Sequence, residues 1–346
     1  MTLSVKLSVL DRSHARAGVD AAETFHDTIR LARTVEQLGY HRFWVSEHHG
    51  VPGILGSAPT VLASAVAAST SAIRVGTGGV MLPGHRPMVL AEQFGVLDSL
   101  FPGRVDMGLG RSLAFTTGIR KALGQREEEV ELFGQRLAEL LGWLTGTQTA
   151  HPGVTAYPAP GAGIAPFVLA LDHAAESASV LGLPLVIGLG RDRRRLTAAV
   201  TRYRYGFRPS AWSAHPYVVL AAPVAVADTP QAAERMLRSE AWSIARTRTG
   251  RAFPPLMPAA GVDALRMTQG EREVFQEVLE GFVTGTEEQV ERYLSGAVAD
   301  TGADEILVTT NTHDLDERAE SLRRTARLAG LRPRPAVTGA APPLDD

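Results

Sequence analysis

The segment WVSEHHG, residues 44–50, ends an apolar run with three side chains that can transfer protons or bind a metal. Glu47, His48 and His49 supply a carboxylate and two imidazoles, a common ligand set for transition metals. Histidine also titrates near neutral pH and can act as a general acid or base. Successive side chains of a strand point to opposite faces, so three adjacent residues do not readily converge on one ion. The pattern therefore disfavours a metal site and leaves catalysis, or hydrogen bonding among these residues, as alternatives.

Four further apolar stretches also end in polar or glycine-rich segments. They are GTGGVMLP (76–83), GLGRS (108–112), GLGRD (188–192) and TTNTHD (309–314). In an α/β barrel the carboxyl ends of the parallel strands form one face of the molecule, and reactive residues gather there. If the stretches are parallel strands, these segments and WVSEHHG form a single site.

The elements that must position this site alternate regularly along the chain. The apolar stretches predict strands over residues 3–11, 41–49, 72–82, 103–112, 167–172, 183–190, 217–227 and 304–311. Amphipathic or small-residue stretches predict helices over residues 21–39, 58–70, 87–100, 126–146, 174–182, 192–205, 285–302 and 314–329. The strands are apolar throughout, as expected of parallel strands that are covered on both faces.

Eight strand–helix units favour a (βα)8 TIM barrel over an open, doubly wound sheet. No G-x-G-x-x-G follows the first strand, which argues against a dinucleotide-binding fold. We expect one domain over residues 1–330. Residues 228–285 are too long for a single connection, and we interpret them as an insertion between strands seven and eight that forms a lid. The tail 331–346, rich in proline, is expected to be disordered.

The composition is that of a globular enzyme. Of 346 residues, 45% are hydrophobic and 21% charged, and the net charge of −2 gives no attraction to nucleic acid or to a membrane surface. The chain has no cysteine, which excludes disulfides, thiolate nucleophiles and iron–sulfur clusters. There is no signal-peptide pattern and no run of about 18 apolar residues, so we expect a cytoplasmic protein.

Three segments carry a resemblance to a known family. They are WVSEHHG, the block IRVGTGGVMLPGHRPMVLAEQFGVLDSLFPGRVDMGLGR, and GTEEQVERYLSGAVADTGADEILVTTNTHD near the end. The chain resembles the bacterial-luciferase-like flavin-dependent monooxygenases over residues 3–112 and 284–329, and the middle more loosely. Within that family it is similar to the subgroup with the mensacarcin-pathway oxygenase, whose members act in aromatic-polyketide antibiotic pathways.

The resemblance implies a two-component monooxygenase with a TIM-barrel fold. A separate flavin reductase would supply reduced FMN by diffusion. O2 would add to it to give a C4a-(hydro)peroxyflavin, which would oxygenate a hydrophobic substrate such as an aromatic polyketide in secondary metabolism. The family is usually dimeric, and the small-residue helices 59–70 and 87–99 could pack against a second copy.

The resemblance also assigns site residues. His48 matches the catalytic histidine beside the flavin, where a near-neutral pKa would let it move a proton. Glu47 lies next to it. Gly78 and Gly79 match a place that often carries a non-prolyl cis peptide, and their lack of a Cβ lets a planar ring approach the backbone. Arg111 matches a position near the flavin and its phosphate.

Five positions bear on how the FMN phosphate would be held. Lys121 lies where the family tends to carry a phosphate-binding arginine. Relatives commonly have polar residues where this chain has Ala170 and Leu171. They often have a serine or histidine after strand six, where this chain has Gly188 and so no side chain. Arg191 begins an arginine cluster that could replace the lost groups. Alternatively, these arginines form a solvated first helical turn and FMN binds weakly.

Two other functions fit the same pattern. A deazaflavin (F420)-dependent oxidoreductase would transfer hydride without O2, and the anionic tail of its cofactor would suit the arginine cluster. A catalytically degenerate flavin-binding protein is the second alternative: Leu171 favours it, whereas His48, Gly78 and Arg111 argue against it.

Overall fold

Eight parallel strands close into a barrel. The computed structural model describes residues 3–170 and 173–334. The strands follow one another around the barrel in chain order, and the last of the eight pairs with the first. They are β1 (Lys6–Asp11), β2 (Arg42–Val45), β3 (Arg74–Met81), β4 (Val105–Gly110), β5 (Ala165–Leu169), β6 (Leu185–Gly188), β7 (Val218–Val226) and β9 (Glu305–Thr309). All eight correspond to predicted strands, so the TIM-barrel prediction is confirmed.

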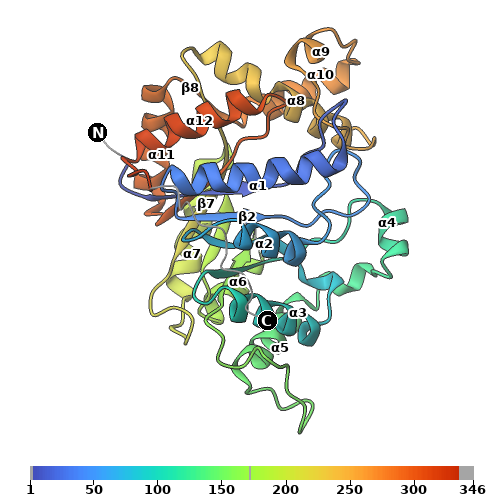
Figure 1. Ribbon diagram of the computed structural model, residues 1–346, viewed down its shortest axis with the longest axis vertical. Coiled ribbons are helices and arrows are strands. Elements are labelled where there is room, and N and C mark those ends of the chain that lie inside the picture. The colour runs from blue at the N-terminus through green and yellow to red at the C-terminus, as the bar shows by residue number, and fades with distance from the viewer. Residues whose placement is uncertain (1–2, 171–172, 335–346) are drawn as a thin grey trace, which may run out of the picture.

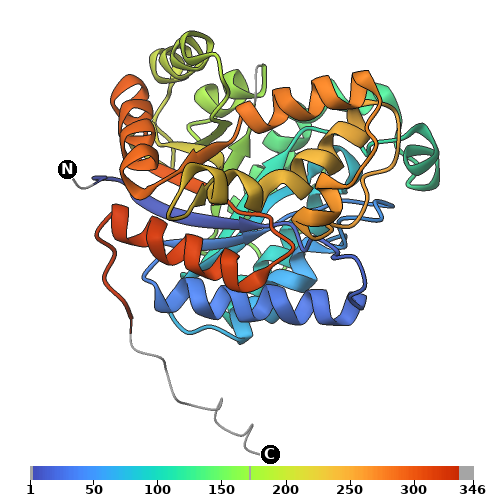
Figure 2. The ribbon, with the colours of Figure 1, turned by 90° about the horizontal axis from the view of Figure 1, so that it is seen from above.

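Helices surround the barrel. They are α1 (Ala21–Gln37), α2 (Pro59–Ala68), α3 (Pro87–Leu100), α4 (Thr117–Ala122), α5 (Phe133–Thr145), α6 (His173–Val180), α7 (Arg193–Gly206), α8 (Pro230–Arg248), α9 (Ala259–Asp263), α10 (Gln269–Glu280), α11 (Glu287–Thr301) and α12 (Leu315–Leu328), with 3-10 turns η1 (Leu82–Gly84) and η2 (Glu127–Val130). Figures 1 and 2 show α12 beside α1, which brings the last repeat against the first. No helix in the described ranges combines the length and the apolarity needed to cross a membrane.

The amino-terminal end of the barrel is filled by buried charges. The Arg42 guanidinium lies 2.7 Å from Asp106 and 2.8 Å from Glu305, and all three side chains are buried. Above them the rings of Trp44 and Phe167 meet edge to face, 5.0 Å apart, inside an apolar layer. These two layers of side chains fill the barrel at the amino-terminal ends and in the middle of the strands. They leave room for a ligand at the carboxyl ends of the strands.

The predicted helix 126–146 is two elements. The turn η2 covers Glu127–Val130, and α5 begins at Phe133. The Glu129 side chain accepts a hydrogen bond from the backbone N–H of Arg126, which caps η2 as a separate turn. The short polar helix α4 was not predicted, because it has no apolar periodicity.

The predicted insertion 228–285 contains three helices and a short strand. The strand β8 (Val283–Gly285) pairs in parallel with β7, and α8, α9 and α10 share a small core of their own. Between α8 and α9 the chain is tied to the loop after β1: Leu256 exchanges backbone hydrogen bonds with Ala15 and Ala17. The insertion therefore packs on the carboxyl-terminal side of the barrel, and its movement as a lid stays a prediction.

Candidate active site

A cavity of about 570 Å³ opens at the carboxyl ends of the barrel strands. Its size is in the range of small-molecule and cofactor sites. The described residues that line it are Leu10, Arg12, Gly78, Met81, Gly110, Arg111, Ser112, Val130, Leu169, Ala170, Ala174, Val186, Gly188, Ala221 and Leu307. Three predicted site residues, Gly78, Arg111 and Gly188, therefore meet in one cavity although they come from different strands.

His48 lies just after β2 and is half-buried. Its Nδ1 is 3.2 Å from the Ser46 hydroxyl, and its ring stacks against Phe115 at 5.7 Å. Burial, together with the positive charge of Arg12, lowers the pKa of His48 to about 3. The expectation of a near-neutral pKa was therefore wrong: Ser46, and not a carboxylate, is its side-chain partner, and the imidazole is neutral at physiological pH. His48 is not among the described lining residues, but it lies close enough to Arg12 to feel its charge.

Glu47 is buried and fully engaged. Its carboxylate accepts hydrogen bonds from the Met81 backbone N–H at 2.8 Å, and its Oε1 lies 2.7 Å from His49 Nε2 and 2.9 Å from His85 Nε2. Burial alone would raise the pKa of Glu47, but the hydrogen bonds from His85, Met81 and His49 hold that pKa below its usual value. Glu47 therefore joins the loops after β2 and β3.

The alternation of side chains at this strand end is confirmed. Glu47 and His49 bind each other, whereas His48 has a separate set of partners. Within the part of the chain that the structure describes, no group of three histidine, aspartate or glutamate side chains is arranged so that it could hold a metal ion. The bond of His85 to the same carboxylate was not predicted, because the position of His85 in the sequence does not indicate that it reaches Glu47.

The peptide between Gly78 and Gly79 is cis, as the resemblance implied. A Cβ on Gly78 would lie 2.9 Å from the side chains of both Leu10 and Trp44, and one on Gly79 would lie 2.8 Å from a backbone oxygen of Gly108. Glycine is therefore required at both positions by the packing of the barrel itself. At Gly78 it also leaves bare backbone facing the cavity, where a planar ring can lie close.

Two guanidinium groups line the cavity. Arg111 follows β4, and its closest charged neighbour is the exposed carboxylate of Glu131, at 3.6 Å. Arg12 follows β1 and was missed in the sequence, although a charged residue directly after a barrel strand was a signal for it. Among the described lining residues only Arg12, Arg111 and Ser112 have polar side chains. The cavity thus combines apolar walls with two cations, and it fits a planar anionic cofactor such as FMN.

The other residues predicted to hold the cofactor lie elsewhere. Lys121 is exposed on α4, and Arg191 forms an ion pair with Glu280 at 2.7 Å; neither is among the described lining residues. Leu171 lies outside the described residues. Ala170 contributes an apolar wall. Arg191 precedes α7 and pairs with Glu280 of α10, so Arg111 and Ser112, which line the cavity, are better placed for a phosphate.

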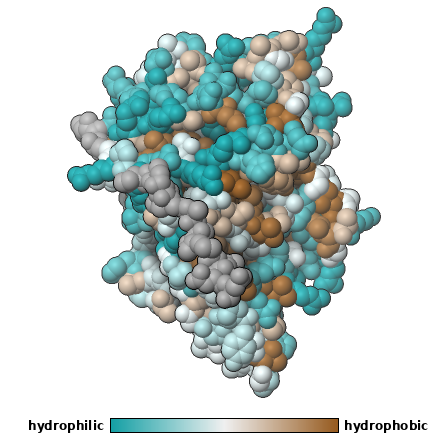
Figure 3. Space-filling view, in the orientation of Figure 1, coloured by the Kyte–Doolittle hydropathy of each residue, from teal (hydrophilic) through white to brown (hydrophobic). Residues whose placement is uncertain are grey.

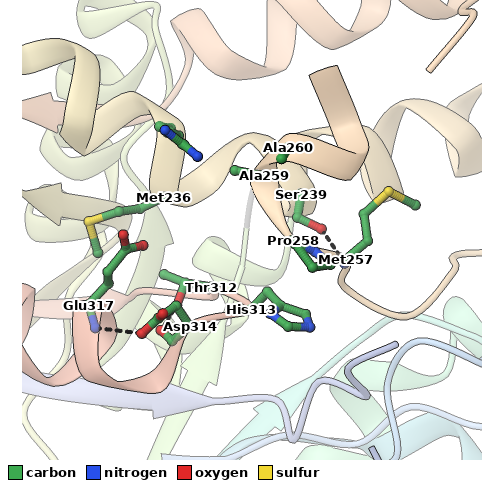
Figure 4. Close-up of a pocket in the computed structure, with 11 residues that line it drawn as sticks. Met236, Ser239, Met257, Pro258, Ala259, Ala260, Thr312, His313, Asp314 and Glu317 are labelled. Carbon is green, nitrogen blue, oxygen red and sulfur yellow. Dashed lines mark hydrogen bonds between the residues drawn. The ribbon is translucent and has the colours of Figure 1, made fainter. Parts of the chain in front are cut away.

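A second, smaller pocket lies between α8 and the loop that follows β9. Its volume is about 170 Å³, which is below the usual size of a cofactor site. Figure 4 shows Ser239 and Met257 on one side of it and Asp314 and Glu317 on the other. The Ser239 hydroxyl accepts a hydrogen bond from the Met257 backbone N–H, and Asp314 caps α12. The first bond lies within the insertion and the second at the start of α12, so each stabilises its own side of the pocket.

Comparison with known proteins gives a consistent result. The family model described as luciferase-like monooxygenase matches residues 5–305. A luciferase-like monooxygenase of Escherichia coli (strain K12) is 33% identical over 322 residues, which are 92% of this chain and 95% of that protein. The crystal structure of apo-MsnO8 is 29% identical, with a TM-score of 0.81, and the match covers 95% of this chain and 100% of that one.

More distant solved structures share the fold alone. The oxygenating constituent of 3,6-diketocamphane monooxygenase from Pseudomonas putida, in complex with FMN, is 17% identical with a TM-score of 0.69 over 94% of this chain and 97% of that one. An F420-dependent secondary alcohol dehydrogenase is 13% identical with a TM-score of 0.70 over 94% and 99%. The barrel therefore occurs with both cofactors, and the choice between them depends on the site.

Proposed function

Because the chain belongs to the luciferase-like monooxygenase family, we propose that it oxygenates a small hydrophobic molecule with O2 and reduced FMN. A separate reductase would deliver the reduced FMN. The observation that carries this proposal is the cavity at the barrel mouth, with the Gly78 backbone on one side, apolar walls, and Arg111 and Ser112 together. When bound there, reduced FMN supplies the electrons that activate O2.

In this proposal Arg111 and Ser112 bind the cofactor, and His48 forms a hydrogen bond with a ligand. Arg111 and Ser112 can donate hydrogen bonds to a phosphate, and the apolar walls exclude water. The neutral imidazole of His48 has one nitrogen beside Ser46, and its other nitrogen can accept a hydrogen bond from a ligand or donate one to it, depending on the tautomer. Glu47 holds the two loops that frame this end of the barrel.

The small number of polar side chains available to a phosphate supports the two-component part of the proposal. Ala170 and Gly188 line the cavity and have no hydrogen-bonding side chain to offer a phosphate. A phosphate site with few side-chain donors suits a flavin that arrives reduced and leaves oxidised. A substrate of the aromatic-polyketide type, and a role in secondary metabolism, are consistent with the mostly apolar lining.

Anaerobic titration with reduced FMN tests the proposed site. We expect saturable binding that weakens at least tenfold in Arg111→Gln, since a charge-assisted hydrogen bond contributes about 1.5–3 kcal/mol. Lys121→Gln and Arg191→Gln serve as matched controls, because both side chains lie away from the cavity lining, and we expect them to bind as the wild type does. Absence of binding by the wild-type protein would contradict the proposal.

F420 is the alternative cofactor, favoured by the occurrence of the same barrel in an F420-dependent enzyme and by the cationic cavity. Anaerobic oxidation of reduced F420 by the purified protein, without reduced FMN, would establish it. A degenerate, non-catalytic flavin-binding protein would bind reduced FMN in the titration but oxygenate nothing.

We further propose a homodimer formed through α2 and α3. Val61 and Leu100 are 70% and 61% exposed, and Val89 and Val96 are also exposed on these two helices. Figure 3 shows hydrophobic side chains on the face that carries α2 and α3. Exposed apolar residues that cluster in this way are typical of protein–protein interfaces.

A further inference from the structure

The cavity presents two separate cations, whereas FMN has one phosphate. Arg12 follows β1 and Arg111 follows β4, with β2 and β3 between them, so the two guanidiniums enter from different sides of the mouth. No carboxylate is found among the described lining residues. The second positive charge therefore has no counterpart in the cavity wall.

The Arg12 guanidinium has hydrogen-bond donors to spare. Its nearest charged neighbour is Glu240, whose Oε1 lies 3.6 Å from Nη1, too far for a hydrogen bond. No acceptor within the described ranges hydrogen-bonds to the side chain of Arg12, which is 31% exposed. A guanidinium has five N–H donors in a fixed fork that matches a carboxylate or another planar oxygen anion.

A buried acidic residue, Glu240, lies beside Arg12 and is not one of the described residues that line the cavity. Glu240, on α8, is 1% exposed, and its Oε1 accepts a hydrogen bond of 2.7 Å from the Asn311 side chain after β9. Burial raises the pKa of Glu240, although the charge of Arg12 opposes this. At 3.6 Å, Glu240 attracts the guanidinium without occupying its donors. The arrangement orients Arg12 and leaves it available to a ligand.

We propose that Arg12 is a specificity-determining residue that binds an ionised oxygen of the substrate. The substrate class is then a hydrophobic molecule with one acidic group, a carboxylate or a phenolate. Apolar side chains make up most of the cavity and suit the body of such a molecule, while Arg12 binds its charge. This inference rests on the proposed function, because it assigns Arg111 to the FMN phosphate and Arg12 to the substrate.

The test compares two probes that differ in charge and hardly in shape, 2-naphthoate and 2-naphthamide. Their dissociation constants are measured by calorimetry at saturating FMN. The wild type should bind 2-naphthoate at least tenfold more tightly, the effect of one charge-assisted hydrogen bond. Arg12→Gln should abolish this ratio and leave the affinity for 2-naphthamide unchanged. Arg12→Lys, which keeps the charge but not the fork, should give an intermediate ratio and serves if Arg12→Gln does not fold.

Arg111→Gln is the matched control from the same cavity. It should weaken FMN binding and keep the preference for 2-naphthoate. A ratio near one in the wild type, or an unchanged ratio in Arg12→Gln, would overturn the inference. The inference would also be overturned if Arg12→Gln kept the preference for 2-naphthoate but bound reduced FMN more weakly and oxidised FMN as before. Arg12 would then bind the anionic reduced flavin and not the substrate.

Failure of the proposed function has a different signature. If the wild type bound no FMN, the titration of the preceding subsection would fail. The preference for 2-naphthoate, and its loss in Arg12→Gln, would still be measurable in the flavin-free protein. The two hypotheses can therefore be rejected independently.

Discussion

At the scale of single residues, Glu47 and His48 are adjacent in the chain but differ in their environments. Glu47 has three hydrogen-bond donors around its carboxylate and joins two loops. His48 has a hydroxyl and a phenyl ring as neighbours, with a positive charge nearby. The same peptide segment thus supplies a structural anchor and a neutral imidazole. This separation lets His48 respond to a ligand without disturbing the loops that Glu47 fixes.

The pKa of His48 predicts how stability depends on pH. The unfolded chain takes up a proton near pH 6.5, whereas the folded protein does so only near pH 3. Between these values the unfolded state binds more protons, so stability should fall as the pH falls. From pH 7 to pH 5 the wild type should lose about 2 kcal/mol more unfolding free energy than His48→Asn, measured by urea denaturation. Equal losses in the two proteins would show that the folded state protonates His48 normally.

At the scale of elements, the apolar stretches predicted the barrel strands well, because parallel strands buried on both faces have a distinctive composition. The lengths of the loops and the splitting of helix 126–146 could not be predicted, because they depend on side-chain partners such as Arg126 and Glu129. The same limit applies to the site. Strand-end position located the segments of the site, and the family resemblance then pointed to His48, Gly78 and Arg111 within them. Neither could predict the bonds of Glu47 to His85 or of Glu240 to Asn311, which join distant parts of the chain.

The close packing of β3 leads to a prediction for Gly78. Gly78→Ala should lower the unfolding free energy by about 1–3 kcal/mol, because its Cβ would press on Leu10 and Trp44. It should also weaken reduced-FMN binding by narrowing the cavity. Gly296→Ala, in α11, is the matched control, since nothing lies within 4 Å of its added Cβ; in a helix it should stabilise by about 0.4–1 kcal/mol. Equal effects of the two substitutions would refute the packing argument.

At the scale of the whole molecule, the chain is a flavin-dependent monooxygenase built on a closed barrel. Buried charges at one end and an apolar layer in the middle leave one end of the barrel for chemistry. The insertion is fastened to the first loop by backbone hydrogen bonds on that same side. The outer face of α2 and α3 is left with exposed apolar side chains and no partner within the described chain.

The dimer proposal can be tested on this outer face. Val61→Glu should convert a dimer to a monomer in light scattering after size-exclusion chromatography, because a charge would be buried at the interface without a partner. Tyr205→Glu is the control: Tyr205 is 95% exposed on α7, away from α2 and α3. A wild type that is monomeric at micromolar concentration would contradict the proposal.

The most direct test of the central claim is the source of the oxygen in the product. The protein would be incubated with FMN, a flavin reductase, NADH, ¹⁸O2 and planar aromatic acids that include 2-naphthoate, and the products analysed by mass spectrometry. We predict a product with one ¹⁸O atom that requires the reductase and falls by about 10²-fold in His48→Ala. A product that formed without O2 or without reduced FMN, or that took its oxygen from water, would contradict the account.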